Sequence, residues 1–312
     1  MSTAGKTGSV ANQPLVSIGL PVYNGERYLD SALHSLVNQT YANFELIICD
    51  NASTDATSEI CLKYARSDPR VRYFRNETNI GGANNHNLTF RYAEGKYFRW
   101  AAHDDLLAPD LIEKCVEFLE ENPRVVLCCS DCILIDEWST PKETYACVSG
   151  SSPDVFERFV QLTGPHFCYE IYGLMRRELV HQTGLHRNYP DADRTFLVHL
   201  GLLGQFHRIA EPLFRKRRHP GMSTQVFPED YDRFAWFGKS YEKRLAPPHL
   251  VQLFHLLAII TKAPVSIPIK LRCYAHLMNW IIYHRRSLVR ELARFCRRLI
   301  GRDTSREMPA PR

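Results

Sequence analysis

Residues 96–110 read KYFRWAAHDDLLAPD, and this stretch decides the fold. It begins as an aromatic, apolar run that is typical of a buried strand. It then stops at His103, Asp104 and Asp105, before a helix signal behind Pro109. Two adjacent carboxylates at the tip of a buried strand are costly unless a cation lies beside them, and a divalent metal carrying phosphate oxygens would satisfy them. An exposed acidic turn before a helix would need no ligand, and the stretch alone does not decide between the two.

Strand and helix patterns alternate on both sides of this stretch. Four further apolar runs predict strands, at residues 15–20, 44–49, 71–74 and 125–129. Amphipathic segments predict helices, at residues 26–39, 57–66, 83–93 and 109–121. This alternation, with near-continuous apolar strands and short loops, predicts an α/β fold: a Rossmann-like, mostly parallel sheet with helices on both faces.

The second half of the chain carries weaker signals. Residues 136–165 are expected to form a variable loop. The segments expected after it are a strand at 168–175, a short helix at 176–182, a helix at 194–204 and a strand at 206–210. From about residue 225 only helical patterns remain, so we expect a helical extension there.

Bulk composition sets the class of protein and its compartment. The 312 residues are 45% hydrophobic with a net charge of +5, which is the balance of an ordinary globular protein. Ten cysteines are scattered without the paired spacing of a zinc site, and this indicates a reducing, cytoplasmic compartment. No apolar run is long enough for a transmembrane helix.

Polar clusters follow three of the predicted strands, at the point where each strand ends. They lie at residues 21–24, 50–55 and 103–105. Because ligands bind at the carboxyl ends of parallel strands, these clusters are expected to meet at one edge of the sheet. If residues 103–105 were only an exposed acidic turn, no such convergence would be expected. The three clusters together therefore favour a site for phosphate and metal.

Five motifs, taken together, resemble one enzyme family. They are PVYNGERYLDSALHSLVNQTY from residue 21, FELIICDNASTD from 44, HDDLLAPD from 103, PDADRTFLVHL from 190 and RRHPGMS from 217. In this order and spacing the chain resembles the family 2 inverting glycosyltransferases, which have the GT-A fold. The resemblance covers residues 14–224 and implies that they form the catalytic domain. A disordered lead at 1–13 would precede it, and a basic, amphipathic helical extension at 225–312 would follow.

The resemblance implies a reaction, a donor and a metal. A sugar would move from a nucleotide-diphospho-sugar to an acceptor hydroxyl with inversion, in cell-surface polysaccharide or glycolipid biosynthesis. Such a transfer needs the nucleotide held, the charge of the diphosphate leaving group stabilised, and a general base for the hydroxyl. A site of carboxylates and phosphates favours Mg²⁺ or Mn²⁺ as the cofactor. A saccharide or a lipid-linked molecule would be the acceptor.

The first two motifs supply the nucleotide pocket that the resemblance implies. Asp50 is similar to the carboxylate that hydrogen-bonds the edge of the nucleobase. Pro21, Tyr23 and Asn24 resemble the wall of the same pocket. Asp55 is similar to a second acid of that loop, but it also stands where a residue would cap the helix at 57–66.

The third motif resembles the DXD-type metal motif of the family. By this resemblance Asp105 binds the metal that bridges the phosphates, and Asp104 contacts the ribose. His103 stands where the leading carboxylate of the pattern would be. Its role is left open between a ribose contact and simple packing, because a buried, satisfied histidine is the commoner case.

The fourth motif supplies the general base. Asp193 lies at the start of a predicted helix after a loop, as the catalytic carboxylate of the family does. Asp191 is the second candidate, because an alanine separates the two acids here. The alternative is that one of the pair caps the helix. An inverting displacement needs only one base opposite the leaving group, so no second acid is required.

The last motif follows the final predicted strand and is strongly basic. The resemblance implies that Arg218 closes over the diphosphate and that His219 reaches the metal, with Arg217 a weaker candidate. A basic run is more often a solvated face, and that alternative stays open.

The C-terminal segment is basic and leaves two interpretations. Residues 263–302 hold nine Lys or Arg and one Glu. Apolar residues from Leu277 to Leu299 fall on one helical face, and arginines from Arg286 to Arg298 fall on the other. The helix either packs on the catalytic domain or lies on an anionic membrane surface, which would place the enzyme peripherally on the inner face of the cell membrane. Nothing in the pattern indicates a nucleic acid partner.

Two alternative functions were weighed against this prediction. A sugar-phosphate nucleotidyltransferase has a related sheet, but it would carry a Gly-rich, basic loop after the first strand, and residues 21–24 do not form one. A non-catalytic nucleotide-sugar-binding module would have no need of Asp50, Asp105 and Asp193 together.

Overall fold

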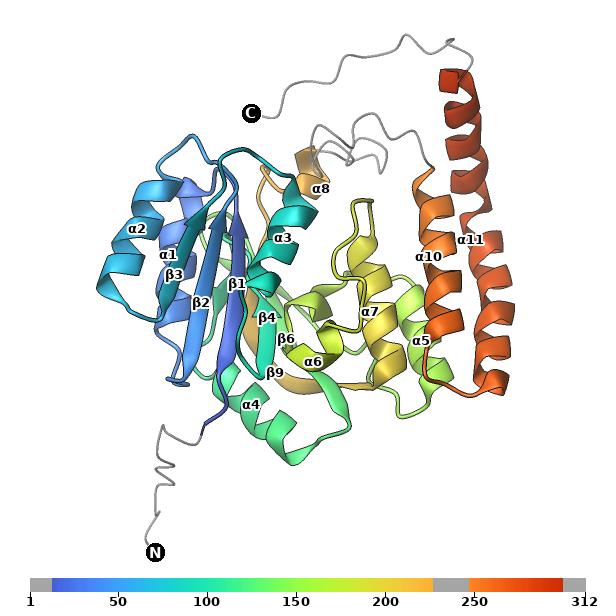
Figure 1. The fold of residues 1–312 in the computed structure, drawn as a ribbon, viewed down its shortest axis with the longest axis horizontal. Helices are drawn as coiled ribbons and strands as arrows, with labels where there is room; N and C mark the ends of the chain where they lie inside the picture. The colour runs from blue at the N-terminus through green and yellow to red at the C-terminus, as the bar shows by residue number, and fades with distance from the viewer. Residues whose placement is uncertain (1–12, 227–246, 300–312) are drawn as a thin grey trace, which may run out of the picture.

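The computed structural model describes residues 13–226 and 247–299 of the chain. The lead predicted at 1–13 lies almost wholly outside these described residues, as does the end of the chain beyond residue 299. A single nine-stranded sheet is flanked by helices, and two long C-terminal helices pack at one side of it (Figure 1). The predicted α/β class is confirmed.

The strands run in the order β3-β2-β1-β4-β8-β6-β9-β5, and β7 pairs with β6. Their bounds are β1 Val16–Val22, β2 Phe44–Asp50, β3 Val71–Arg75, β4 Tyr97–Trp100, β5 Leu106–Leu107, β6 Val125–Ile135, β7 Pro141–Tyr145, β8 Leu174–Arg176 and β9 Gln205–Arg217. Strands β3, β2, β1 and β4 pair in parallel, and so do β6 and β9. Strands β8, β5 and β7 add antiparallel pairs.

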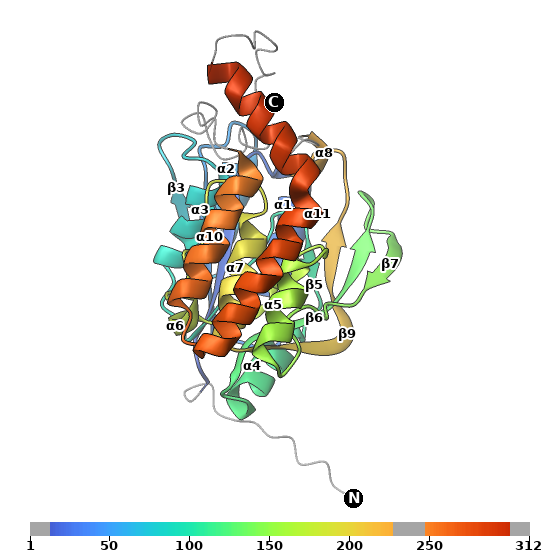
Figure 2. The same cartoon turned by 90° about the vertical axis from the view of Figure 1, so that its right-hand side faces the viewer.

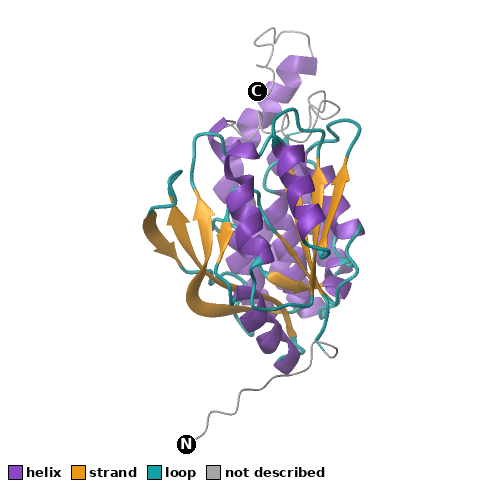
Figure 3. Cartoon of the chain, turned by 90° about the vertical axis from the view of Figure 1, so that its left-hand side faces the viewer, coloured by secondary structure: helices purple, strands orange, loops and turns teal. Residues whose placement is uncertain are grey.

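Helices cover the sheet on both faces. Their bounds are α1 Glu26–Val37, α2 Thr57–Ser67, α3 Gly82–Arg91, α4 Leu111–Glu121, α5 Val155–Thr163, α6 Arg177–Val180, α7 Ala192–Leu203, α8 Ser223–Val226, α10 Pro248–Lys262 and α11 Ile267–Leu299. The connections through α1 and α2 cross the sheet in one direction, and α3 leads back past β1 to β4. Because such crossovers are right-handed, α1 and α2 lie on one face and α3 on the other. Figure 3 shows helices packed against the middle of the sheet, while the strands at the left of the view extend beyond them.

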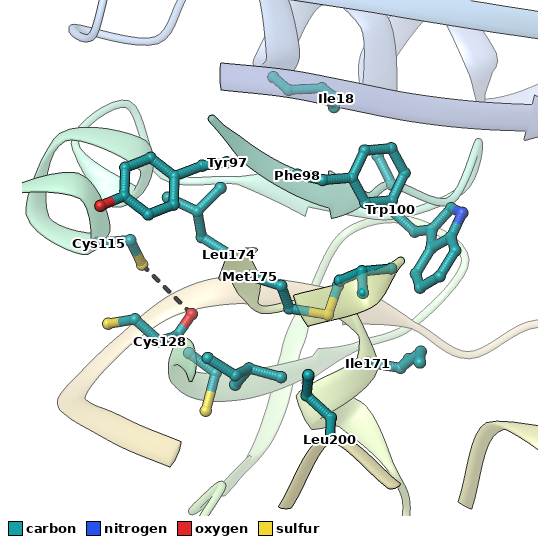
Figure 4. Packing of buried hydrophobic residues seen from close by; sticks show 14 of the residues in the cluster. Ile18, Tyr97, Phe98, Trp100, Cys115, Cys128, Ile171, Leu174, Met175 and Leu200 are labelled. Atoms are coloured by element: carbon teal, nitrogen blue, oxygen red, sulfur yellow. Dashed lines mark hydrogen bonds between the residues drawn. The ribbon is translucent and has the colours of Figure 1, made fainter. Parts of the chain in front are cut away.

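The core lies where β4 and β8 meet β6 and its covering helices (Figure 4). The rings of Phe98 and Trp100 meet edge to face at 4.9 Å, and both are fully buried. Cys115 of α4 donates its thiol to the carbonyl oxygen of Cys128 in β6 at 3.6 Å. All ten cysteines are free thiols and nine of them are buried, so they act as small core residues.

Three expectations from the sequence were wrong. The variable loop predicted at 136–165 contains strand β7 and helix α5. The strand predicted at 168–175 is mostly a 3₁₀ helix, Tyr169–Tyr172, and only β8 after it is extended. The last strand continues to Arg217, because Asp105 takes up the Lys216 ammonium and the Arg217 backbone amide and so buries a segment that looks solvated.

The C-terminal helices pack on the rest of the chain. Figure 2 shows α10 and α11 side by side on the outside of α5 and α7. The buried side chains of these two helices join the same core cluster as the strands. Among the described residues, no helix is long and apolar enough to cross a bilayer.

Candidate active site

The three predicted polar clusters meet at the carboxyl edge of β1, β2 and β4, as the sequence implied. Val22 is paired with Asp50 across β1 and β2, and Gly19 with Trp100 across β1 and β4. Strands β1 and β2 therefore end at one level, and β4 ends three residues short of it, opposite Gly19, so the loops that follow the three strands leave the same edge of the sheet. This edge is where a parallel sheet offers backbone groups and side chains to a ligand.

Several hydrogen bonds join the loops after β1 and β2, among them four made by Asn24, Gly25 and Glu26. Asn24 Oδ1 accepts from the Thr54 amide at 2.9 Å, and the Gly25 amide donates to Thr57 Oγ1 at 2.8 Å. Asp55 accepts from the Glu26 amide at 3.1 Å, while Glu26 accepts from the Ala56 amide at 2.9 Å. We call this set the loop clasp. It fixes the turn that carries Tyr23 and Asn24.

Asp55 also accepts from the amide of Thr57, the first residue of α2, at 3.0 Å. Burial tends to raise the pKa of this carboxyl, but the hydrogen bonds from Thr57 and Glu26 hold it below its usual value. The structure thus places Asp55 at the start of the helix, as the capping alternative had it.

Asp50 lies fully buried at the end of β2 with three donors around it. Its Oδ1 accepts from the Ser53 amide at 2.9 Å. Its Oδ2 accepts from the Tyr73 hydroxyl at 2.8 Å and from Arg75 Nη1 at 3.1 Å. The Arg75 side chain remains 43% exposed, so it is Arg75 that presents N–H groups outward from this pocket. Tyr73 and Arg75, from β3, were missed by sequence reasoning.

Asp104 and His219 form a pair on the other side of the edge. Asp104 Oδ2 lies 2.9 Å from His219 Nε2, and each side chain keeps only 10% of its surface exposed. Burial alone would raise the pKa of Asp104, but Lys216, His219 and His103 hold it well below its usual value. Asp104 is therefore a carboxylate, and with His219 it offers one oxygen and one nitrogen at the same point.

Asp105 has different surroundings, although it is the next residue. Its Oδ2 accepts from Lys216 Nζ at 3.0 Å, and its Oδ1 accepts from the Arg217 amide at 2.9 Å. The side chain has no exposed surface. Burial raises the pKa of Asp105 to about 6 against the lowering effect of Lys216, and Asp104 adds to the rise. Both oxygens are engaged, and His219 lies beside Asp104 instead.

No group of three or more His, Cys, Asp or Glu side chains in residues 13–226 and 247–299 is placed to hold a metal ion. Asp104 and His219 supply two ligands. A hard divalent ion that takes its remaining ligands from phosphate and water fits such a site, because Mg²⁺ is commonly held by one or two protein groups together with substrate phosphates.

His103 packs against the first turn of α1. A Cβ atom added at Gly25 would lie 2.7 Å from His103 Cδ2, so the two residues are in close contact. Burial lowers the pKa of His103, which keeps the ring neutral at pH 7. The packing role left open by the sequence is therefore the one that the contacts support.

Arg217 and Arg218 have opposite surroundings. Arg217 is buried: its Nε donates to the carbonyl oxygen of Asp104 at 2.8 Å, and its guanidinium lies 4.6 Å above the Tyr28 ring. Arg218 keeps 47% of its side chain exposed and contacts Glu143 at 3.3 Å. Arg218 is thus the member of the pair that can reach a ligand.

Asp193 is the second residue of α7, at the end of the helix that faces this edge. Its Oδ1 accepts from the Arg194 amide at 2.8 Å. Burial, and then the neighbouring Asp191, raise the pKa of Asp193 to about 6. Asp191 adopts a left-handed backbone at φ 61° and makes no side-chain cap to α7. Of the two acids, Asp193 has the pKa that suits a general base near neutral pH.

Arg194 holds the segment before β8 against the start of α7. It donates to the carbonyl oxygen of His166 at 3.0 Å and lies 2.7 Å from His166 Nδ1. Burial, and then the Arg194 charge, lower the pKa of His166 to about 4. The ring therefore stays neutral, and its Nδ1 can accept a hydrogen bond from the Arg194 guanidinium. Arg194 thereby fixes the position of its neighbour, Asp193.

Tyr172 feels charges from both halves of the site, and sequence reasoning missed it. Lys216 Nζ lies 5.4 Å from its ring centre. Burial raises the pKa of Tyr172, Lys216 lowers it, and Asp105, Asp104 and Asp193 raise it again. All of these groups are therefore within electrostatic reach of one hydroxyl, which brings the metal motif and the candidate base into one site.

Three aromatic rings gather beside Arg218, and we call them the aromatic ledge: Tyr145, Phe167 and Tyr169. Phe167 and Tyr169 stack at 5.4 Å, and Tyr145 meets both rings edge to face. Phe167 is 59% exposed. The Arg218 guanidinium lies 5.8 Å from its ring. No motif pointed to these residues, because they come from the segments whose structure was wrongly predicted.

Comparisons with known proteins identify the family of the chain. Residues 17–184 match the family model described as glycosyl transferase family 2. The chain is 28% identical over 242 residues to an uncharacterized glycosyltransferase of Haemophilus influenzae, with 72% of each chain covered. It is 34% identical over 159 residues to the putative glycosyltransferase EpsE of Bacillus subtilis, with 50% of this chain and 54% of that one covered. Several curated relatives are thus matched over only about half of their length or less.

Solved structures share the fold. TarS residues 1–349 from S. aureus, in complex with UDP-GlcNAc, align with 90% of this chain and 80% of that one, at a TM-score of 0.64 and 16% identity. The mannosyltransferase PcManGT from Pyrobaculum calidifontis, in complex with GDP-Man and Mn²⁺, aligns with 94% and 88%, at a TM-score of 0.50 and 18% identity. At such identities the likeness shows the fold alone. The family match covers more than half of the chain, so the resemblance in the motifs is confirmed: this protein belongs to glycosyl transferase family 2 and is a glycosyltransferase with the GT-A fold.

Proposed function

We propose that this enzyme transfers a sugar from a nucleotide-diphospho-sugar to an acceptor hydroxyl with inversion, in the assembly of a cell-surface polysaccharide or glycolipid. The observation that carries the proposal is that Asp104, Asp105 and Asp193 all act electrostatically on the Tyr172 hydroxyl, while Lys216 contacts both Asp105 and the Tyr172 ring. A leaving-group site and a base beside one another are what a direct displacement needs. The putative teichuronic acid biosynthesis glycosyltransferase TuaG of Bacillus subtilis is a relative whose name fits this setting.

The nucleotide would bind between the ends of β1, β2 and β3. In this proposal Asp50 orients Tyr73 and Arg75, and the exposed N–H groups of Arg75 meet the nucleobase edge together with any acceptor capacity left on Asp50. Pro21, Tyr23 and Asn24 form the wall, held by the loop clasp. Because the clasp fixes these groups before the donor arrives, little conformational entropy is lost on binding.

We assign the metal to Asp104 and His219 and give Asp105 a positioning role, which revises the assignment made from the sequence. Mg²⁺ or Mn²⁺ held there would neutralise charge on the departing diphosphate. Asp105 neutralises Lys216 and accepts from the Arg217 amide, and so it holds the end of β9 on which His219 follows. Arg218 is placed to donate to a phosphate oxygen. The Mn²⁺ of PcManGT supports this choice of ion.

Asp193 is the general base of the proposed reaction. With a pKa of about 6 it is mostly ionised at pH 7 and still basic enough to accept a hydroxyl proton. It removes that proton as the acceptor oxygen attacks the sugar carbon from the side opposite the diphosphate. The carbon–oxygen bond to the diphosphate breaks in the same step, which inverts the configuration.

The acceptor would approach over the aromatic ledge. Sugar rings have an apolar face of C–H groups that stacks on aromatic rings, and Phe167 is exposed enough to offer one. Arg218 beside it can donate to ring hydroxyls. We therefore favour a saccharide acceptor, free or linked to a lipid. We place the enzyme in the cytoplasm, with a peripheral site on the inner face of the membrane where lipid-linked acceptors lie.

A donor panel tests the proposal. Purified full-length protein is incubated with UDP- and GDP-sugars, with and without Mn²⁺, and release of the nucleoside diphosphate is measured together with thermal shifts by UDP and GDP. We expect one donor class to be hydrolysed slowly without acceptor, only with metal, and the matching nucleotide to raise the melting temperature. No turnover of any donor, together with no nucleotide shift in the presence of metal, would overturn the proposed function.

A further inference from the structure

The inner face of helix α11 packs against the rest of the protein. Cys273, Leu277 and Trp280 are buried against α10 and the catalytic core. The only carboxylate of the helix, Glu291, is also buried and accepts from the His249 amide of α10 at 3.0 Å. The packing alternative raised by the sequence therefore describes this face correctly.

A second set of apolar side chains lies on the outer face of the same helix, and we call it the apolar strip. Its five members are each 57 to 73% exposed: Ile267, Leu271, Met278, Ile282 and Val289. They follow one another at intervals of four, seven, four and seven residues, which keeps them on one line along a helix. Isolated exposed apolar residues are common, but a continuous line of five on one helix indicates a contact surface.

Four exposed arginines lie next to this line, and we call them the arginine strip: Arg286, Arg290, Arg294 and Arg297. At 100° per residue they lie on the solvent side of the apolar strip, between it and the rim of the inner face. Two of them, Arg290 and Arg297, contact carbonyl oxygens of the preceding turn at 3.4 Å. Because Glu291 is buried, α11 itself places no carboxylate among the arginines of its outward surface.

We propose that this outer face binds the surface of a membrane that contains anionic lipids. The apolar strip would enter the boundary between headgroups and acyl chains, and the arginine strip would bind lipid phosphates. A second copy of the chain is the other occupant that an apolar line could take. It would bring one positively charged helix against another, which charge repulsion opposes.

The position of α11 links the proposed membrane contact to the candidate active site. Figure 2 shows the helix on the outside of the molecule, so nothing in the described chain covers its outer face. On the inner side, His284 lies within electrostatic reach of Asp191 and Arg194, beside the candidate base. Membrane binding is independent of the proposed reaction. That it brings a lipid-linked acceptor to Asp193 rests on the proposed function.

Vesicle flotation of the full-length protein tests the proposal. Two vesicle compositions are compared, phosphatidylcholine alone and phosphatidylcholine with about 30 mol% phosphatidylglycerol. We expect binding to the anionic vesicles only, and weaker binding in about 0.5 M NaCl, where surface charge is screened. Ile282→Asp and the pair Arg286→Glu with Arg290→Glu should each reduce binding more than tenfold.

Matched controls come from α2, at the opposite side of the molecule, where Leu62 and Arg66 are exposed. Leu62→Asp and the pair Lys63→Glu with Arg66→Glu make matching changes of polarity and net charge and should bind like the wild type, and circular dichroism checks that every variant is folded. Equal binding by the α11 variants and these controls, or no binding to anionic vesicles, would overturn the proposal. A dimer in light scattering that Ile282→Asp converts to a monomer, without vesicle binding, would identify the face as an interface between copies.

Discussion

Two neighbouring carboxylates, Asp104 and Asp105, should respond differently to the same substitution. Asp104→Asn removes the proposed metal ligand that faces His219, so metal-dependent nucleotide binding should be lost while the protein stays folded. Asp105→Asn leaves the Lys216 ammonium buried without its counter-charge, which typically costs about 3–5 kcal/mol of stability. Thermal unfolding, and the shift produced by UDP or GDP with Mn²⁺, measure the two effects separately.

Asn replaces Asp with almost no change of shape, so packing is conserved in both variants. If Asp105→Asn melts like the wild type and loses metal-dependent binding while Asp104→Asn keeps it, then the metal belongs to Asp105, as the sequence suggested. The geometry makes the opposite prediction because both Asp105 oxygens are already engaged.

The base can be identified by its titration. In the proposed reaction transfer requires the Asp193 carboxylate, so the rate should rise with pH through about 6 and level off above it. Asp193→Asn should keep donor binding and lose about 10²- to 10⁴-fold in transfer. The pH profile of kcat and the donor affinity of the variant are the measurements, with Asp191→Asn as the matched control.

The ionisation of the Asp193 carboxyl should lower the stability of the fold over the same pH range in which it raises the rate of transfer. Because burial raises its folded-state pKa, its neutral form favours folding below about pH 4, and that contribution is lost as the pH rises through about 6. Asp193→Asn should therefore gain stability over the wild type as the pH rises from 4 to 6, and the difference should be constant above that. A pH-independent difference would mean that the carboxyl is not buried as described.

The sequence points to candidate site residues more readily than to the side chains that they contact. Asp50, Asp104, Asp193 and His219 are predicted site residues because a short motif at a strand end or helix start marks each of them. Lys216 was missed because nothing in a basic run tells which member is buried, and only the approach of β9 to Asp105 decides it. Such long-range partners leave no local signal in the sequence.

At the scale of elements, the loop clasp determines how firmly the nucleotide wall is held. Asp55→Ala removes the acceptor for the amides of Glu26 and Thr57 at once. Loss of a cap of this kind costs about 0.5–2 kcal/mol, so a small fall in melting temperature is expected. Because Tyr23 and Asn24 lie on the same loop, nucleotide affinity should fall several-fold.

The control for this change is Asp30→Ala on α1, which removes an exposed ion pair with Lys63 that is remote from the pocket. Both variants are titrated with the nucleotide that the donor panel identifies. Unchanged affinity in Asp55→Ala would mean that the clasp contributes to stability but does not organise the pocket.

Elements with a strong local period were predicted well, and those made by long-range pairing were not. Strands β1 and β2 and helices α1 and α4 follow continuous apolar runs or clear amphipathic faces, and their predicted and observed bounds nearly coincide. Strand β7 is exposed along most of its length and pairs with β6 through its backbone, so its polar sequence carries no strand signal. The predicted end of the last strand was wrong for a similar reason, because contacts of Lys216 and Arg217 with Asp105 extend β9.

At the scale of the whole molecule, the C-terminal helices are part of one core with the catalytic domain. The sequence changes character near residue 225, which suggested a separate extension. However, Leu256, Ile260 and Leu277 are almost completely buried in the cluster that also contains the strands. Composition shows where a pattern changes, but only tertiary contacts show whether the two parts share a core.

This arrangement predicts the outcome of truncation. A chain that ends at residue 246 lacks α10 and α11 and exposes the surfaces of α5 and α7 on which they pack. Burial of a large apolar side chain contributes about 1.5–3 kcal/mol, and at least five such side chains lose their partners. The sum is comparable with the whole stability of a typical domain, about 5–15 kcal/mol. The truncated chain should therefore be largely insoluble, or soluble without cooperative unfolding.

The matched comparison is Ile282→Asp, which changes the outer face of α11 and leaves its inner face intact. Soluble yield, near-ultraviolet circular dichroism and calorimetry should show a native protein for this variant and a disordered core for the truncated chain. A truncated chain that unfolds cooperatively at the wild-type temperature would show that the helices dock as an independent unit. We expect the truncated chain to be unfolded, so its loss of membrane binding would not identify the residues that contact the bilayer. Loss of membrane binding in a folded Ile282→Asp variant would identify them.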